Sequence, residues 1–290
     1  MLVALLALLT ASDGGLSELE EFRERVNRPV ALTVPGTHRV QILSDRPYGP
    51  GDKAHRFDAY LPERRDRRAA VVVLVHGGVS ADVPFRPKDW GLYRSWGRLL
   101  AASGFVAIAF NHRLSFPDPM LAEADQDLTA MLQTVRAQSR TLGADPSRIA
   151  LVAFSGGGPL LSRPLREELP GVRALAGFYP FLDPRKSALH QRFLKPDALT
   201  AFSPAAQLRT PVARRMPFFL ARAGKDAIPD ILPGIDAFVA ESLAAGTPLT
   251  LFNHPEAPHG FDQEAGPRTR EVLLAFLAFL QTHLAERPPS

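Results

Sequence analysis

The sequence predicts one α/β domain with a mostly parallel central sheet and helices on both faces of that sheet. Two observations carry this prediction. Predicted strands alternate with predicted helices along nearly the whole chain, which is typical of parallel strands joined by crossover helices. Residues 69–75 are continuously apolar and rich in valine, as expected for a strand buried on both faces. The 290 residues, 46% of them hydrophobic, suffice for one large domain.

The expected elements follow one another in a regular order. Residues 13–30 have a helical pattern, and residues 1–30 are expected to form an N-terminal tether ahead of a domain that spans 31–290. Apolar periodicity and turn residues place the later elements. The predicted strands are 40–43, 56–61, 69–75, 105–110, 149–154, 174–179, 218–221 and 249–252, and the predicted helices are about 90–103, 121–142, 231–245 and 269–285.

One connection in this pattern is unusually long. Residues 180–217 join two predicted strands and contain several prolines, and a connection of this length is uncommon between neighbouring elements. It leaves the sheet at the edge where ligands of such sheets bind. We therefore expect a small lid insertion here, with a wandering surface loop as the alternative.

The first residues leave the cellular compartment open. Residues 2–11 have the length of the apolar core of a signal peptide, and residues 10–12 offer small side chains for cleavage. No positive charge besides the amino terminus precedes them, so the alternative is a short cytoplasmic helix. The protein is accordingly expected to be either exported or cytoplasmic. No apolar run reaches about eighteen residues, so no membrane span is expected.

Composition excludes several kinds of site and partner. The chain has no cysteine, which rules out disulfides, thiolate metal sites and a cysteine nucleophile. The formal net charge of +4 comes from scattered basic residues that are not interleaved with aromatic ones. The densest cluster, 64–68, lies just before a predicted strand and is expected to be a solvated loop. We therefore expect no nucleic-acid partner.

The segment that ends at Ser155 carries the strongest functional signal. An apolar run over 149–154 stops at this serine, and three glycines follow at once. This is the pattern of a nucleophile elbow, in which a buried strand turns sharply into a helix and presents its serine. The usual motif is G-x-S-x-G, and here Ala153 replaces the first glycine. The alternative is a glycine-rich turn of a nucleotide-binding or other α/β domain.

A serine nucleophile needs a base, and His259 is the best candidate. The base must hydrogen-bond to the serine, and in this architecture it follows both the serine and the acid in the chain. His259 stands just past the last predicted strand and before the last predicted helix. His254 lies nearer the strand end, where a structural role is expected, and His190 falls in the predicted lid.

The acid that orients the histidine is expected to be Asp226. It follows the predicted strand 218–221 at a point where the strand leaves the sheet. Asp183, after the preceding strand, is the geometric rival. Asp230 is explained by the start of a helix, where an acidic residue is favourable. Asp262 is too close to the base in sequence to reach its far nitrogen easily.

The negative charge of a tetrahedral intermediate also needs donors, and one loop can supply them. Gly77, Gly78 and Val79 follow the buried strand 69–75, where backbone N–H groups are free to face a ligand. Gly156 follows the serine at the start of a helix and is expected to provide a second donor. The alternative is that these glycines only make the turn. His76 is expected to be a hydrogen-bonded scaffold residue.

Several sequence segments, taken together in their order along the chain, resemble those of serine esterases of the α/β-hydrolase superfamily. The resemblance is close to dienelactone-hydrolase-like and hormone-sensitive-lipase-like carboxylesterases. The resemblance covers about residues 40–285 and rests on His76-Gly-Gly78, Asn111-His-Arg-Leu114, Asp145-Pro-Ser-Arg-Ile149, the elbow, Gly224-Lys-Asp226 and His259-Gly-Phe261. It implies an α/β-hydrolase fold without metal or cofactor. It also implies Ser155 as nucleophile, His259 as general base and acid, Asp226 as orienting carboxylate, and an oxyanion hole from Gly77, Gly78 or Val79 with Gly156.

Two departures bear on the expected substrate and donors. The oxyanion loop ends in Val79 where the family has a third glycine, and dienelactone hydrolases use cysteine where this chain has Ser155. The expected reaction is hydrolysis of a small-molecule carboxylic ester through an acyl-enzyme. The alternatives are a peptidase or thioesterase of the same fold, a carbohydrate acetyl-esterase, or a non-catalytic binding protein of this fold.

Overall fold

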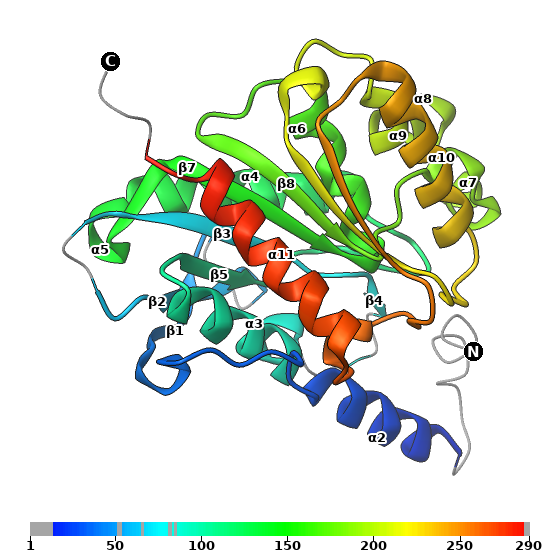
Figure 1. Ribbon diagram of the computed structural model, residues 1–290. Coiled ribbons are helices and arrows are strands. Elements are labelled where there is room, and N and C mark those ends of the chain that lie inside the picture. The colour runs from blue at the N-terminus through cyan, green and yellow to red at the C-terminus, as the bar shows by residue number, and fades with distance from the viewer. Residues whose placement is uncertain (1–13, 51–53, 65–66, 81–82, 84–85, 287–290) are drawn as a thin grey trace.

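The computed structural model describes residues 14–50, 54–64, 67–80, 83 and 86–286. Its centre is an eight-stranded sheet with the order β1-β2-β5-β3-β7-β8-β9-β10 (Figure 1). The strands are β1 (Gln41–Pro47), β2 (Arg56–Leu61), β3 (Ala69–Val75), β5 (Val106–Phe110), β7 (Ala144–Phe154), β8 (Val172–Phe178), β9 (Phe218–Ala223) and β10 (Leu249–His254).

Most neighbouring strands of the sheet are parallel. β2 runs antiparallel to β1 and to β5, and every other pair of neighbours is parallel. β3 lies between β5 and β7, and all of its residues after Ala69 are buried, as its continuous apolar pattern predicts. The predicted α/β class with a mostly parallel sheet is confirmed.

Helices cover both faces of the sheet and enclose two apolar cores. On one face lie α3 (Gly91–Ala102) and α11 (Pro267–His283), and α11 crosses the sheet in the view of Figure 1. The other face is covered by α4 (Leu121–Ala137), α6 (Ser162–Arg166) and α10 (Ile231–Ala245). The helix predicted over 121–142 is divided, because a separate turn of helix, α5 (Ser139–Leu142), follows α4.

Two segments outside the main sheet shape the surface around its carboxyl edge. Residues 180–217 contain three short helices, α7 (Ala188–Phe193), α8 (Pro196–Ala201) and α9 (Pro204–Gln207). The loops after β3 and β5 are joined by a second small sheet, in which β4 (Val79–Ser80) pairs with β6 (Ser115–Phe116) in parallel. This pairing fixes the loop that begins at His76 against the loop that begins at Asn111.

The N-terminal helix α2 (Gly14–Asn27) forms over most of the stretch predicted to be helical. Its carboxyl end is held by two side chains. The Gly91 N–H donates to Asn27 Oδ1 at 2.9 Å, and Gln263 Nε2 donates to the carbonyl oxygens of Arg25 and Arg28, both at 2.8 Å. The signal-peptide prediction for residues 1–12 falls outside the described residues. Within the described part of the chain, no helix is long and apolar enough to cross a membrane.

Candidate active site

The strand β7 ends in a sharp turn that presents Ser155. The backbone of Ser155 has a φ of 50°, in the left-handed region that non-glycine residues rarely occupy, and a 3₁₀ helix (Ser155–Leu161) begins there. The Ser155 carbonyl accepts a hydrogen bond of 2.8 Å from the Phe181 N–H, which holds the turn against the loop after β8. Such strain persists only where the surroundings impose it, and it is characteristic of functional sites.

The three glycines after Ser155 are required by close backbone packing. A Cβ atom on Gly157 would lie 2.6 Å from the His76 carbonyl oxygen, and one on Gly158 would lie 2.1 Å from the Phe181 carbonyl oxygen. One on Gly156 would lie 3.0 Å from the Gly78 nitrogen. Any side chain here would therefore push the turn away from its two neighbouring loops.

The alanine that replaces the first elbow glycine fits the sheet without strain. Ala153 is fully buried in β7, and its partner in the register of β8 is Gly177. The Ala153 methyl group belongs to the apolar core on the face of the sheet that α4, α6 and α10 cover. The departure from the usual motif is thus compatible with the turn at Ser155.

His259 and Asp226 form a direct hydrogen bond. His259 follows β10, Asp226 follows β9, and His259 Nδ1 lies 2.6 Å from Asp226 Oδ2. The Asp226 side chain is fully buried, and its second oxygen accepts the Ile228 N–H at 3.0 Å. Since Nδ1 faces the carboxylate, His259 Nε2 is the nitrogen that remains for a reacting group.

The loops that carry these two residues are joined through their backbones. The Lys225 N–H donates to the Ala257 carbonyl and the Gly224 N–H to the His254 carbonyl, both at 2.8 Å. A Cβ atom on Gly224 would lie 2.3 Å from the Pro255 carbonyl oxygen. The short distance between His259 and Asp226 therefore depends on glycine at position 224.

Two other candidate acids, Asp183 and Asp262, accept hydrogen bonds from side chains other than His259. Asp183 accepts from Arg185 at 2.7 and 2.9 Å and from Ser203 Oγ at 2.9 Å. Asp262 accepts from Trp96 Nε1 and from the Tyr179 hydroxyl, both at 2.7 Å. Burial raises the pKa of Asp262, although these two donors oppose the shift. Among the candidate acids, the structure brings only Asp226 to His259 within the described residues.

Ser155 and His259 line the same cavity, which has a volume of about 140 Å³. Gly77 and Gly78 of the predicted oxyanion loop, residues 76–79, also line it, and the walls are mostly apolar. The wall residues are Leu19, Phe22, Val26, Val83, Trp90, Leu92, Tyr93, Phe154 and Tyr179, with Arg25, Gly260 and Gln263 completing the lining. The Tyr179 ring lies 4.4 Å from the His259 ring, between their centroids, and limits how the imidazole can turn.

Helix α2 forms one wall of this cavity, which the sequence did not indicate. Leu19, Phe22 and Val26 all face it, and the Phe22 ring meets the Trp90 ring edge-on at 5.5 Å. Their spacing of three and four residues places them on one helical face. The sequence therefore shows an apolar face on this helix but not the surface that the face packs against. Of the described residues that line the cavity, none comes from 180–217. A lid function for that segment stays a prediction.

The expected oxyanion donors occupy three different environments. The Gly77 N–H donates to the Tyr93 hydroxyl at 3.3 Å, so this amide already has an acceptor. The Gly78 nitrogen lies beside Gly156, close to the start of the helix that follows Ser155. Val79 belongs to the small sheet through its pairing with Ser115. Gly78 and Gly156 are therefore the two predicted donors that lie next to each other at the elbow.

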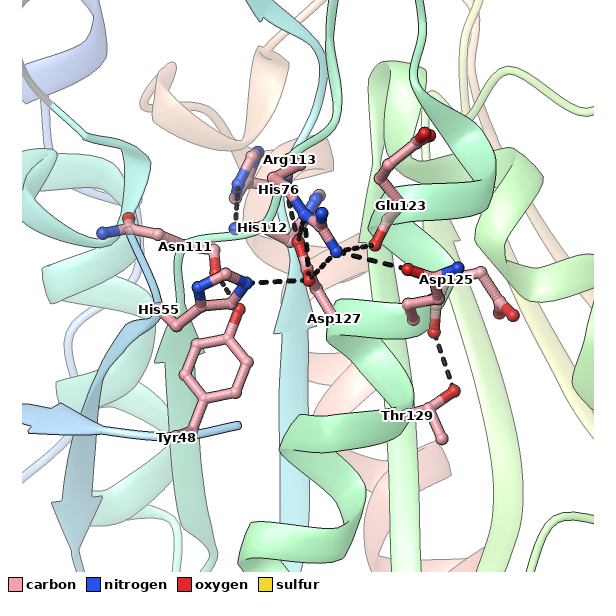
Figure 2. A network of polar contacts seen from close by, with 11 residues as sticks. Tyr48, His55, His76, Asn111, His112, Arg113, Glu123, Asp125, Asp127 and Thr129 are labelled. Atoms are coloured by element: carbon pink, nitrogen blue, oxygen red, sulfur yellow. Dashed lines mark hydrogen bonds and ion pairs between the residues drawn. The ribbon is translucent and has the colours of Figure 1, made fainter. Parts of the chain in front are cut away.

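A buried polar network holds the oxyanion loop from behind (Figure 2). The His112 N–H donates to His76 Nε2 at 3.2 Å, so His76 carries its proton on Nδ1 and donates it to the Gly77 carbonyl at 2.7 Å. The two imidazole rings are stacked with centroids 3.5 Å apart. Burial lowers the pKa of His76 to about 4, which keeps this ring neutral and its tautomer fixed.

Asp127 anchors the other side of the same network. It accepts from Arg113 at 2.7 and 2.9 Å and lies 3.0 Å from His55 Nε2 (Figure 2). The Arg113 backbone N–H also donates to Asp127 at 2.9 Å. Arg113 belongs to the segment after β5 that carries His112, so α4 and the oxyanion loop are tied together through this carboxylate.

Comparison with known proteins bears on the family and the fold. The BD-FAE family model matches residues 57–162, a stretch that includes the oxyanion loop and Ser155. A probable isoprenylcysteine alpha-carbonyl methylesterase of Arabidopsis thaliana is 29% identical over 133 residues, which make up 44% of this chain and 29% of that protein. The chain therefore matches less than a third of the length of this relative.

Solved structures align over most of the chain. Esterase B of Lactobacillus rhamnosis aligns with a TM-score of 0.73 at 19% identity, covering 96% of each chain. The chain has the α/β-hydrolase fold. A truncated carbohydrate esterase from gut microbiota also aligns with this chain, with a TM-score of 0.68 at 18% identity over 83% of this chain and 96% of that one.

Gly224→Ala is expected to lower kcat/KM for the test ester p-nitrophenyl butyrate by roughly 10²-fold, the cost of misplacing a reacting group by about 1 Å. The added methyl group would clash with the Pro255 carbonyl and move Asp226 away from His259. Gly266→Ala is the matched control, because Gly266 has extended backbone and open space around it. Equal kinetics of the two variants would contradict the role given to position 224.

Proposed function

We propose that the protein is a carboxylesterase that uses Ser155 as nucleophile, His259 as general base and acid, and Asp226 as the carboxylate that orients the imidazole. The observation that carries this proposal is the bond of 2.6 Å between His259 Nδ1 and the buried Asp226, beside the strained Ser155 in one cavity. The names of the similar proteins, a methylesterase and two esterases, support the same reaction class.

In the acylation step, Ser155 Oγ attacks the carbonyl carbon of the ester while His259 Nε2 accepts the hydroxyl proton. The bond between that carbon and the alcohol oxygen then breaks, and His259 returns the proton to the leaving alcohol. Asp226 stays ionised and stabilises the imidazolium that forms between these two transfers. The products of this half-reaction are a free alcohol and an acyl group on Ser155.

In the deacylation step, water takes the place of the alcohol. His259 Nε2 accepts a proton from water, whose oxygen attacks the acyl carbon, and the same proton then returns to Ser155 Oγ as the acid leaves. Both tetrahedral intermediates carry an oxyanion. Gly156 N–H lies at the start of the helix after the elbow, where unpaired amides favour a negative charge, and we assign it and Gly78 N–H as donors.

The His76 hydrogen bond supports this assignment of Gly78. The Gly77 carbonyl and the Gly78 N–H belong to one planar trans peptide, in which they point in opposite directions. Because His76 Nδ1–H holds the Gly77 carbonyl from the buried side, the Gly78 N–H is turned toward Gly156 and Ser155. The polar network of Figure 2 thus sets the orientation of a proposed catalytic donor.

The cavity favours an ester whose acyl or alcohol group is small and apolar. Its volume of about 140 Å³ is close to that of an engineered cavity of roughly 150 Å³ that accommodates benzene. Its walls are aromatic and aliphatic side chains from α2, α3 and the elbow. We therefore propose a substrate group of about four to six carbon atoms at this position, on the basis of that volume comparison.

The proposed roles predict unequal effects for two buried aspartates. Asp226→Asn is expected to lower kcat for p-nitrophenyl butyrate by about 10²–10⁴-fold while the fold is retained, because the amide no longer fixes the histidine tautomer. Asp183→Asn is the matched control, since Asp183 pairs with Arg185 and Ser203 away from His259. A wild-type protein without esterase activity, or a greater loss in the control, would refute the proposal.

The wall formed by α2 predicts a change in chain-length preference. Phe22→Ala should enlarge the cavity and raise the ratio of kcat/KM for p-nitrophenyl octanoate over butyrate by about fivefold or more, since burying even one further methylene contributes about 0.8 kcal/mol. Phe193→Ala removes an aromatic ring that is 42% exposed on α7 and should leave the ratio unchanged. An unchanged ratio in Phe22→Ala would exclude α2 from the substrate site.

A further inference from the structure

Tyr93 is a buried tyrosine that lines the cavity and whose hydroxyl binds a backbone amide of the oxyanion loop. It belongs to the first turn of α3, is 4% exposed, and lines the cavity together with Ser155, Gly77 and Gly78. Its ring is fixed by edge-on contact with the Phe154 ring at 5.4 Å and by the Trp90 ring at 5.9 Å. The hydroxyl is thus held in place by the residue that precedes the proposed nucleophile.

The hydroxyl of Tyr93 accepts one hydrogen bond and still has a proton to donate. The Gly77 N–H donates to it at 3.3 Å, which uses one lone pair of the phenolic oxygen. Within the described part of the chain, the structure gives the phenolic proton no protein acceptor. The carboxylate Asp262 accepts from Trp96 and Tyr179, and no hydrogen bond joins it to Tyr93 among the described residues. The open direction for this proton is the cavity.

We propose that the Tyr93 hydroxyl is a third oxyanion donor, beside the N–H groups of Gly78 and Gly156. This inference rests on the proposed esterase function and extends it to a side chain of α3. A Cβ atom on Gly77 would lie 3.5 Å from Ser155 Oγ, so the residue whose amide binds Tyr93 lies beside the attacking oxygen. Tyr93 keeps its proton throughout and only donates a hydrogen bond to the negative oxygen.

Two properties of the site strengthen Tyr93 as a donor. The bond from Gly77 N–H polarises the phenol, because hydrogen bonds in a chain reinforce one another in a low-dielectric interior. Burial raises the pKa of Tyr93, so the hydroxyl stays protonated wherever His259 can act as a base. The Gly77 N–H would then stabilise the oxyanion indirectly, through the Tyr93 hydroxyl. This explains why an amide of the oxyanion loop donates its hydrogen bond to a side chain.

Tyr93→Phe tests this role because it removes the hydroxyl and keeps the packed ring. For p-nitrophenyl butyrate we expect kcat to fall by about 10²–10³-fold, the range for loss of one oxyanion donor, with KM within about twofold of wild type. Tyr60→Phe is the matched control. Tyr60 is also a buried tyrosine against α3, packed on Gly97, and lies outside the cavity lining.

A pair of inhibitors separates a donor from a packing role. Trifluoromethyl butyl ketone forms an adduct with serine that carries an oxyanion, and pentanamide binds without forming one. The proposal predicts that Tyr93→Phe weakens inhibition by the ketone by the same factor as kcat and leaves inhibition by the amide unchanged. Equal weakening of both inhibitors, or a kcat within about threefold of wild type, would overturn it.

If Tyr93→Phe does not fold, difluorotyrosine at position 93 provides the same test in a shape-conserving variant. The fluorinated phenol ionises at a lower pH, so a donor role predicts that activity is lost at a correspondingly lower alkaline pH than in wild type. An unchanged pH profile would overturn the proposal. Failure of the esterase function itself would appear separately, as absence of ester hydrolysis by the wild-type protein.

Discussion

The left-handed backbone of Ser155 is the constraint on which the site depends. A strand that ends in this conformation must reverse within one residue, and the following backbone then packs directly on the loops after β3 and β8. The distances of 2.6 and 2.1 Å from hypothetical Cβ atoms on Gly157 and Gly158 show how little space remains. The strain is small compared with the packing around it, and it projects the serine out of the sheet.

The sheet order turns this local feature into a site. β7, β8, β9 and β10 are consecutive parallel neighbours, so the loops at their carboxyl ends meet at one edge. β3 lies on the other side of β7 and brings the oxyanion loop to the same place. Backbone hydrogen bonds between the Asp226 and His259 loops then reduce the freedom of both side chains. Much of the geometry is therefore set by the backbone before any substrate binds.

The polar network behind the oxyanion loop joins residues that lie far apart in the sequence. It uses a neutral His76, a stacked His112 and a carboxylate from α4, and all three are buried. The buried nitrogens of the His112 ring have no hydrogen-bond partner among the described residues. Burial lowers the pKa of His112 well below its usual value, so this ring is neutral and contributes by stacking. The loop is thus held to the His112 backbone by a hydrogen bond and by the stacking of two neutral rings, and the Arg113–Asp127 ion pair fixes that segment to α4.

Some parts of this arrangement could be predicted because the sequence specifies them within a few residues. The strand-serine-glycine run, Asp226 after β9 and His259 after β10 all carry their signal within a few residues, and the order of elements predicts their common edge. The place of helix α2 and of Tyr93 in the cavity wall could not be predicted, for a physical reason. Each is an ordinary residue pattern whose role arises only through contact with Trp90 or Gly77, far away in the chain. The small sheet of β4 and β6 was missed likewise, because two-residue strands have no periodicity.

We propose above that Ser155 is a nucleophile that the fold activates. Fluorophosphonate labelling of the folded protein, followed by mass spectrometry of its peptides, tests this most directly. We predict a single phosphonylated residue, Ser155, in wild type, no labelling in Ser155→Ala, and no labelling after unfolding. A folded wild-type protein that stays unlabelled at Ser155, or is labelled equally at another serine, would contradict it.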